Sequence, residues 1–548
     1  MSAPSFNARI LPLPQVDISP FTPDAAPGAR SVGLAFSGGG SRALTCAMGQ
    51  LRGLRLLGLL DDVFAISSVS GGTWANALYS FLPERISDDD FLGIPVLDPS
   101  LLTLFEGPYA LDQLPPGNLG WVPTGLGLFN DLDEILKLKL EYGYPNADLW
   151  QGLIGDRILA RYGLFEPDAQ GFDSHYFSWT DAYLRLPNGT LARNPQLSAG
   201  QFRTVQRQRP FPIFNTAIFT NDGVDAELAP FEANFMLGVR NALPAGSGRM
   251  GAIGGGLLDS FAMGSRYQGE GPAGSGTVST SVPARPFALN DIVGCSSAAF
   301  AQVLEEKYTE LKGIVPRYGY WPVQARGTQP ALSYRFADGG SLENMGLNAL
   351  LARGVPRIMA FVNTDEAIYR DDASRDIVVS SDIPPLFGFQ PWVAGKGYVP
   401  YAQDPGSGAT RLYRHNQVFP SSQFQPLLNA LYAARQAGGA MLVTQQLQVL
   451  ANSWFNVPAQ GSVTVLWVYN DFVQSWWNEL HEDVRLAIDA EGLGQFPRYN
   501  TFTQLELSAT LVNALAHLSC WNLASSSTLG NPGGQTNAQV VQALFNAA

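Results

Sequence analysis

Short apolar runs that end in small residues, each followed by apolar residues at helical spacing, recur along this chain. The first such unit spans 31–82, where Val32, Leu34 and Phe36 alternate with their neighbours and predict a strand. Apolar residues then recur every three or four positions over 44–54, which predicts a helix. The unit therefore begins as a strand followed by a helix.

The same reasoning predicts more strands and helices downstream. They are, in chain order, a strand at 63–69, a helix at 71–82, a strand at 213–220, a short element at 291–300, a strand at 334–336, a helix at 342–352 and a strand at 358–362. Alternating strands and helices imply a largely parallel sheet covered on both faces. We therefore predict an α/β fold, a three-layer sandwich with a largely parallel central sheet.

Several stretches interrupt this alternation, and no internal repeat is visible. We expect an extended lead-in at 1–30, followed by one domain over 31–548. The expected interruptions are an inserted cap or lid at about 84–210, a mobile Gly-rich loop at about 245–277, a long loop at about 369–422 and a mainly helical part from about 424.

Composition narrows the class of protein. Hydrophobic residues make up 46% of the 548 residues and charged residues 15%, which permits a large core and argues against disorder. A net charge of −13 argues against nucleic acid as a partner. The three cysteines, Cys46, Cys295 and Cys520, are too far apart to suggest a metal site.

The chain shows no secretion signal and no apolar run long enough to span a bilayer. We therefore expect a soluble or cytoplasmic protein that is at most peripheral at membranes.

A candidate nucleophile lies where the strand at 63–69 meets the following helix. Ser70 is flanked by Ser68, Val69, Gly71 and Gly72, a variant of the G-x-S-x-G elbow with serine in place of the first glycine. Small residues are needed there because the turn is tight and the strand and helix pass close together. The plainer alternative is a small-residue turn without chemistry.

A glycine loop precedes the first helix. Gly38, Gly39 and Gly40 follow Ser37 and could offer free backbone N–H groups to an oxyanion. A phosphate-binding loop is the rival interpretation, but neither G-x-x-x-x-G-K-[ST] nor G-x-G-x-x-G fits. Arg42 could direct a fixed charge at a substrate phosphate, or could be a surface arginine.

A candidate base follows the strand at 334–336. Asp338 precedes Gly339 and Gly340, and an acid at that sheet edge can reach a nucleophile on a neighbouring strand. Alone, this tripeptide is most often a turn. Together with the other two junctions, it makes Asp338 the best candidate base.

These motifs together resemble the cytosolic phospholipase A2 / patatin family of lipid acyl hydrolases. The resemblance rests on S-G-G-G-x-R at 37–42, S-G-G-T-W at 70–74, and D-G-G at 338–340 with Glu343 and Asn344. Weaker similarities are Phe231-Glu232 with Gly238, the small-residue run at 296–299 and the tail at 501–521. The insertion at 84–210 is not matched, and Ser68 departs from the usual glycine.

The resemblance implies a patatin- or cytosolic phospholipase A2-like catalytic domain with a Ser70–Asp338 dyad. Ser70 would attack the ester carbonyl of a phospholipid or lysophospholipid at a membrane or micelle surface, giving an acyl-enzyme. Gly38, Gly39 and Gly40 would line the oxyanion hole, with no cofactor and no metal.

We also expect calcium independence. About thirty residues precede the first catalytic strand, too few for a calcium-binding membrane module, and no EF-hand loop is present.

Two alternatives remain open. One is a catalytically silent protein of this fold that binds lipid or a partner. The other is a Ser-His-Asp hydrolase, in which His415, His481 or His517 would complete a triad. That fold places several strands before the elbow, whereas one is visible here, and His517 lies in a helical stretch typical of a core histidine.

Overall fold

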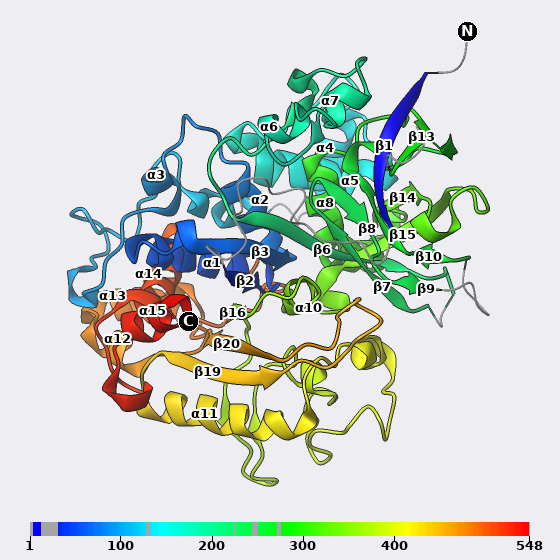
Figure 1. The fold of residues 1–548 in the computed structure, drawn as a ribbon. Helices are drawn as coiled ribbons and strands as arrows, with labels where there is room; N and C mark the ends of the chain where they lie inside the picture. Colours follow the sequence, from blue (N-terminus) through cyan, green and yellow to red (C-terminus); the bar gives the residue numbers. More distant parts are fainter. Residues whose placement is uncertain are drawn as a thin grey trace.

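The computed structural model describes residues 4–12, 31–127, 132–223, 226–243, 250–270 and 276–546. Their main feature is one mixed sheet of 14 strands that runs through the molecule (Figure 1). The strand order along its main path is β12-β13-β1-β11-β8-β7-β6-β3-β2-β16-β20-β19, and β15 pairs with β6 and β14 beside this path.

The centre of the sheet is parallel. Its strands are β6 (Phe211–Phe219), β3 (Val63–Val69), β2 (Val32–Phe36), β16 (Arg357–Val362) and β20 (Ser462–Tyr469). Every residue of β2 is buried, as expected for a strand covered on both faces. Four of them, β6, β3, β2 and β16, correspond to strands predicted from the sequence, whereas β20 lies in the part that was predicted to be mainly helical.

Antiparallel strands extend this centre on both sides, so the sheet is mixed and only its core is parallel. On one side lie β7, β8, β11, β1, β13 and β12, and on the other lies β19. Their bounds, with those of β14 and β15, are Leu228–Ala233 (β7), Met236–Gly238 (β8), Gly256–Asp259 (β11), Ser5–Pro12 (β1), Thr277–Ser281 (β13), Tyr267–Glu270 (β12), Met441–Gln448 (β19), Arg317–Tyr320 (β14) and Leu332–Asp338 (β15).

Helices pack on the sheet from both sides, which confirms the predicted α/β class. α1 (Gly40–Leu56) packs against α2 (Gly71–Ser80) and α14 (Ala509–Ala524). α10 (Leu347–Leu351) contacts β2, β3 and β16. Below β19 in Figure 1 lies α11 (Phe424–Ala437).

The segment predicted as an insertion, 84–210, contains short helices and one two-stranded sheet. Its elements are α3 (Asp88–Leu92), α4 (Leu132–Tyr142), α5 (Asn146–Ile154), α6 (Asp181–Leu184), α7 (Thr190–Arg193), β4 (Tyr176–Phe177) and β5 (Phe202–Arg203). α5 packs on α8 (Leu289–Ser296), which α9 (Ala299–Lys307) follows. Through α5, the segment joins the main core.

Two stretches expected to be irregular contain strands. In the predicted extended lead-in, 5–12 forms β1 in the main sheet, and 13–30 lies outside the described residues. In the predicted loop at 245–277, β10 (Ile253–Gly254), β11 and β12 are regular, whereas 244–249 and 271–275 lie outside the described residues. The glycines there turn the chain between strands, since 254–256 all have positive φ.

The carboxyl-terminal part is helical except for β19 and β20. After them come α12 (Gln474–Glu479), α13 (Glu482–Glu491), α14 and α15 (Asn537–Asn546). The predicted loop at 369–422 contains only the short pair β17 (Tyr369–Arg370) and β18 (Ile377–Val378) and several 3₁₀ turns. Across the described ranges, none of the helices has the length and apolarity needed to span a membrane.

Candidate active site

Ser70 lies at a sharp turn between β3 and α2. Its backbone has φ +50° and ψ −123°, a conformation that costs a non-glycine residue about 1–3 kcal/mol. The chain passes so close to the glycine loop that a Cβ on Gly71 would lie 2.0 Å from the carbonyl oxygen of Gly40. Ser70 therefore occupies a strained elbow, as its small neighbours predicted.

Strand register brings Asp338 to this elbow. β6 pairs with β3 through Asn215 and Val69, and with β15 through Thr216 and Asp338. The residue after Val69 therefore lies beside the end of β15. There the Ser70 hydroxyl donates a hydrogen bond of 3.0 Å to Oδ2 of Asp338.

Burial controls the charge of the Asp338 carboxyl. Loss of solvent raises its pKa to about 6, although hydrogen bonds to its ionised form oppose the shift. Those donors are the Gly340 N–H at 2.8 Å, the Ser70 hydroxyl and the Ala299 N–H at 3.3 Å. The carboxyl is thus ionised at neutral pH, yet it is a stronger base than an ordinary aspartate.

Ser296 supports the elbow through a hydrogen bond to the backbone of Ser70. The Ser70 N–H donates to its hydroxyl at 3.1 Å, and that hydroxyl lies 2.7 Å from the carbonyl oxygen of Asn215. The sequence showed Ser296 only as part of a small-residue run, because its partner is 226 positions away and leaves no local signal.

Three glycines of the loop were predicted to offer N–H groups to an oxyanion, and two of them, Gly39 and Gly40, line the site. The Gly38 N–H is engaged by Asn344, at 3.1 Å from the backbone oxygen and 3.2 Å from Oδ1. Gly39 and Gly40 line the same cavity as Ser70. Within the described ranges, no acceptor meets the Gly39 N–H at the start of α1. Asn344, which the sequence gave no role of its own, therefore fixes the loop.

Arg42 lines the same cavity and is buried. Its Nε donates to the carbonyl oxygen of Asn363 at 2.9 Å, and Nη1 donates to that of Tyr499. Nη1 also lies 3.7 Å from Oδ2 of Asp365. The guanidinium is thus anchored by the protein on one side, and it is not the surface arginine considered from the sequence.

The cavity around Ser70 has a volume of about 280 Å³ and a mixed lining. Besides the residues above, three carboxylates and three aromatic rings line it: Asp365, Glu366, Asp382, Phe300, Tyr413 and Phe502. Burial, reinforced by Glu366, raises the pKa of Asp382 to about 6. In the described part of the chain, no group of histidine, cysteine and acidic residues is arranged to hold a metal ion.

The histidines weighed for a triad lie elsewhere. His517 is buried with Nδ1 3.3 Å from Nη1 of Arg52, and burial holds its pKa well below the usual value. His415 stacks on Trp454 with ring centroids 4.1 Å apart, and His481 precedes α13. No histidine is among the described residues that line the Ser70 cavity.

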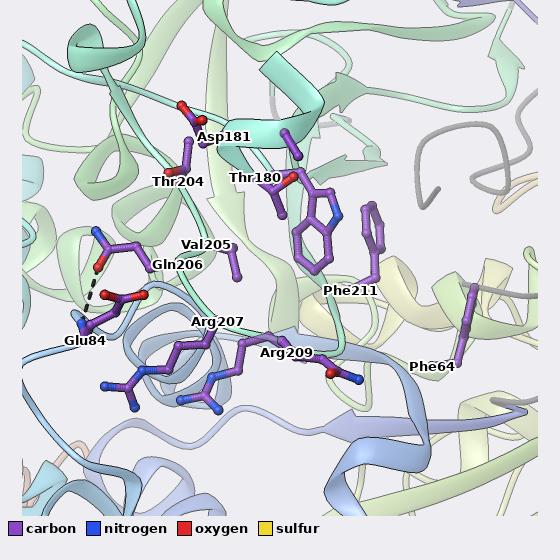
Figure 2. Close-up of a pocket in the computed structure, with 13 residues that line it drawn as sticks. Phe64, Glu84, Thr180, Asp181, Thr204, Val205, Gln206, Arg207, Arg209 and Phe211 are labelled. Carbon is purple, nitrogen blue, oxygen red and sulfur yellow. Dashed lines mark hydrogen bonds between the residues drawn. The ribbon is translucent and has the colours of Figure 1, made fainter. Parts of the chain in front are cut away.

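A larger cavity of about 860 Å³ lies at the other end of β3 (Figure 2). Phe64 and Phe211, near the starts of β3 and β6, line it, whereas Ser70 follows the end of β3. Arg207 and Arg209 point the same way in Figure 2, and both bind Asp88. This cavity is therefore separate from the candidate active site.

Comparisons with known proteins agree with the motifs. The chain is 35% identical to human cytosolic phospholipase A2 delta over 124 residues, covering 22% of this chain and 13% of that protein. It is 54% identical to human cytosolic phospholipase A2 beta over 133 residues, covering 23% and 15%. It is 30% identical to probable lysophospholipase 3 of Schizosaccharomyces pombe over 138 residues, covering 23% and 19%. No family model matches the chain.

Among solved structures, human GIVD cytosolic phospholipase A2 aligns with 94% of this chain and 62% of that chain. The identity is 14% and the TM-score is 0.49. The sequence alignments span less than a fifth of each curated relative. The three sequence alignments confirm the resemblance to the cytosolic phospholipase A2 and lysophospholipase group that the motifs indicated.

Proposed function

We propose that this chain is a lipid acyl hydrolase that cleaves fatty-acyl esters of phospholipids or lysophospholipids. The observation that carries the proposal is the 3.0 Å hydrogen bond from the Ser70 hydroxyl to Asp338 at a strained elbow. The names of the similar proteins, phospholipases A2 and a probable lysophospholipase, support the substrate class.

The first half of the proposed reaction acylates Ser70. Asp338 takes the hydroxyl proton as the Ser70 oxygen attacks the ester carbonyl, which gives a tetrahedral oxyanion. The oxyanion collapses and breaks the bond to the leaving alcohol. Asp338 returns the proton to that alcohol, which leaves an acyl-enzyme and an ionised Asp338.

The second half uses water in place of the alcohol. Asp338 removes a proton from the water, which attacks the acyl-enzyme carbonyl, and the proton then returns to the Ser70 oxygen as the fatty acid leaves. A base with a pKa of about 6 suits both directions of transfer near neutral pH.

We assign oxyanion stabilisation to the N–H groups of Gly39 and Gly40. Both residues line the cavity with Ser70, and they stand at the positive end of α1. Loss of one such donor typically lowers kcat ~10²–10³-fold. Gly38 acts through Asn344 as an anchor of the loop.

We assign the substrate phosphate to Arg42, which brings a positive charge to the described cavity lining. We expect the protein to meet its substrate at a membrane or micelle surface and otherwise to be cytoplasmic. We also expect hydrolysis to require no calcium.

The test is hydrolysis of a lysophospholipid and labelling by a fluorophosphonate probe. Ser70→Ala and Asp338→Asn should both lose ~10³-fold or more in kcat, because they remove the nucleophile and the base. Probe labelling should disappear in Ser70→Ala. The exposed Ser526 and Asp372 supply matched controls, Ser526→Ala and Asp372→Asn, which should behave as wild type.

Histidine variants in the same experiment test whether a Ser-His-Asp triad operates in place of the dyad. His415→Ala, His481→Ala and His517→Ala should each keep turnover within roughly tenfold of wild type. A folded histidine variant as inactive as Ser70→Ala would replace the dyad with a triad. Full activity of Ser70→Ala would refute the proposed function itself.

A further inference from the structure

Ser68 is the residue at which this chain departs from the usual elbow motif, which has a glycine there. Its side chain is fully buried, two residues before the turn at Ser70. The Ser68 hydroxyl lies 3.1 Å from Oγ1 of Thr73 and 3.3 Å from the carbonyl oxygen of Ile213. It also accepts a hydrogen bond of 3.0 Å from Nδ2 of Asn76. A glycine at this position would make none of these three contacts.

Thr73 connects Ser68 to the elbow. Thr73 lies in the first turn of α2, and its Oγ1 accepts a hydrogen bond of 2.9 Å from the Ser296 hydroxyl. Ser296 in turn accepts the Ser70 N–H at 3.1 Å. Ser68, Thr73 and Ser296 therefore form a hydroxyl chain that ends at the backbone of the proposed nucleophile. All three side chains are fully buried, which shields the hydroxyl chain from bulk solvent.

Ser296, the last member of the hydroxyl chain, belongs to a turn that contacts both residues of the proposed dyad. Ser296 ends α8 and accepts the Ser70 N–H, whereas Ala299 begins α9 and donates its N–H to Oδ2 of Asp338 at 3.3 Å. A shift of this turn would therefore move Ser70 relative to Asp338.

Loss of the Ser68 oxygen would leave a buried donor without its acceptor. Nδ2 of Asn76 donates both of its protons, one to Ser68 and one to the carbonyl oxygen of Ile66 at 3.1 Å. Without the Ser68 oxygen, one of these protons would be unpaired, which costs free energy until neighbouring side chains rotate. Rotation of Thr73 is the most direct response, because its hydroxyl lies between those of Ser68 and Ser296.

We propose that Ser68 is a positioning residue, which acts through Thr73 and Ser296 to hold the Ser70 elbow in the geometry that attacks the ester. The backbone of Ser70, at φ +50°, is costly for a serine, so surrounding contacts must enforce it. Ser68 is not among the described residues that line the cavity, so it acts on the nucleophile and not on the substrate. This inference rests on the proposed function and adds to it a residue that sets the rate.

The first test is the kinetics of Ser68→Ala, which removes only the hydroxyl oxygen. This variant should lower kcat for p-nitrophenyl butyrate about fivefold, the effect expected for one buried hydrogen bond. KM should stay within roughly twofold of wild type, because the substrate does not meet this residue. Ser297→Ala is the matched control, since that buried hydroxyl donates to the carbonyl oxygen of Val293 within α8 at 2.8 Å, and it should keep both constants.

A double-mutant cycle tests whether Ser68 acts through Ser296. Ser296→Ala removes the acceptor of the Ser70 N–H and should lower kcat about tenfold. The double variant Ser68→Ala/Ser296→Ala should be no slower than Ser296→Ala alone, because the hydroxyl chain is already interrupted at its end. Independent effects would instead multiply to about fiftyfold. Thermal unfolding of each variant shows that the assayed protein is folded, and Thr73→Val replaces Ser296→Ala in the cycle if the latter does not fold.

The outcomes separate the role of Ser68 from the proposed function. If hydrolysis depends on Ser70 but Ser68→Ala keeps the wild-type kcat, raises KM as strongly as it lowers kcat, or multiplies with Ser296→Ala, the positioning role is refuted and the hydrolase stands. If no ester is hydrolysed in a Ser70-dependent manner, the proposed function is refuted and the positioning role with it.

Discussion

Ser70 and Asp338 are both held in states that their residue types do not favour. Ser70 has a backbone angle of φ +50°, and Asp338 keeps a carboxyl in a site with almost no solvent. Hydrogen bonds from Ser70, Ala299 and Gly340 support the ionised carboxyl, and Ser296 supports the elbow. Such local costs cluster at sites that do chemistry.

The pH dependence of hydrolysis should follow the Asp338 carboxyl. The base must be ionised, so kcat/KM for a soluble ester should be low at acidic pH, rise through a midpoint of about 6 and then stay level. An aspartate with the ordinary value of 3.8 would already be ionised throughout that range. A rate profile flat down to roughly pH 4.5 would contradict this assignment.

A variant of a second cavity carboxyl is the control for this pH profile. Asp382→Asn should keep the midpoint, although Asp382 lines the same cavity and its pKa is also raised to about 6.

Asp338→Asn should be inactive but at least as thermostable as wild type at neutral pH. The pKa of Asp338 is about 6 in the folded protein and 3.8 in the unfolded chain, so folding favours the protonated carboxyl. The stability that this group contributes is therefore complete below pH 3.8 and is lost as the pH rises through about 6. Asparagine is uncharged at every pH and avoids that loss.

Local motifs in the sequence identified the residues of the proposed dyad, but not the residues that hold them. Ser70, Asp338 and the glycines stand in short patterns that tight turns require. Ser296 and Asn344 act through hydrogen bonds to residues far away in the chain, so the stretches at 296–299 and 338–344 that contain them did not reveal that role. Their partners became visible only once the strands were in register.

At the scale of elements, the contact between α1 and α14 positions the glycine loop. A Cβ on Gly49 of α1 would lie 2.1 Å from the backbone oxygen of Ala516 in α14. The same α1 begins at Gly40, beside Ser70. The two helices therefore approach so closely that backbone meets backbone at this crossing.

Gly49→Ala should destabilise the protein by about 1–3 kcal/mol, because the added methyl group overlaps atoms that cannot turn away. Gly53→Ala, one turn later in α1, is the matched control, since its Cβ would meet the oxygen of Cys520 at 3.2 Å. There the better helix propensity of alanine, up to ~1 kcal/mol, offsets the tighter contact. Thermal unfolding of both variants would show equal midpoints if this crossing were loose.

Four strands of the parallel core, β2, β3, β6 and β16, were predicted from the sequence, whereas β20 and most of the antiparallel strands were not. β2 and β16 are short apolar runs that stand beside helical patterns. β19 ends in Gln446, Leu447 and Gln448, of which only the leucine is buried. The strand follows a helix and lies in the part predicted to be mainly helical, so it was not recognised from the sequence. Its pairing with β20, rather than its own residues, makes it a strand.

At the scale of the whole molecule, one sheet connects every part of the candidate site. The nucleophile follows β3, the glycine loop follows β2 and the base ends β15. The proposed reaction therefore draws its nucleophile, its base and its oxyanion donors from the protein itself.

Hydrolysis of a soluble ester should accordingly be unchanged by EDTA. Each catalytic group that we assign is a side chain or backbone N–H, so removal of divalent cations takes away none of them. The measurement is kcat/KM with and without the chelator on a monomeric substrate, which keeps membrane binding out of the comparison. A tenfold or greater loss that calcium restores would show that a metal ion takes part.

β1 gives the beginning of the chain a practical importance for protein engineering. Ser5–Pro12 lies between β11 and β13 and pairs with both, so it joins two parts of the sheet that no other described strand connects. A truncation to Ser31, the start of the first strand–helix unit, would expose two unpaired strand edges, which promote self-association. Expression tags and fusion partners should therefore be added without removing these eight residues.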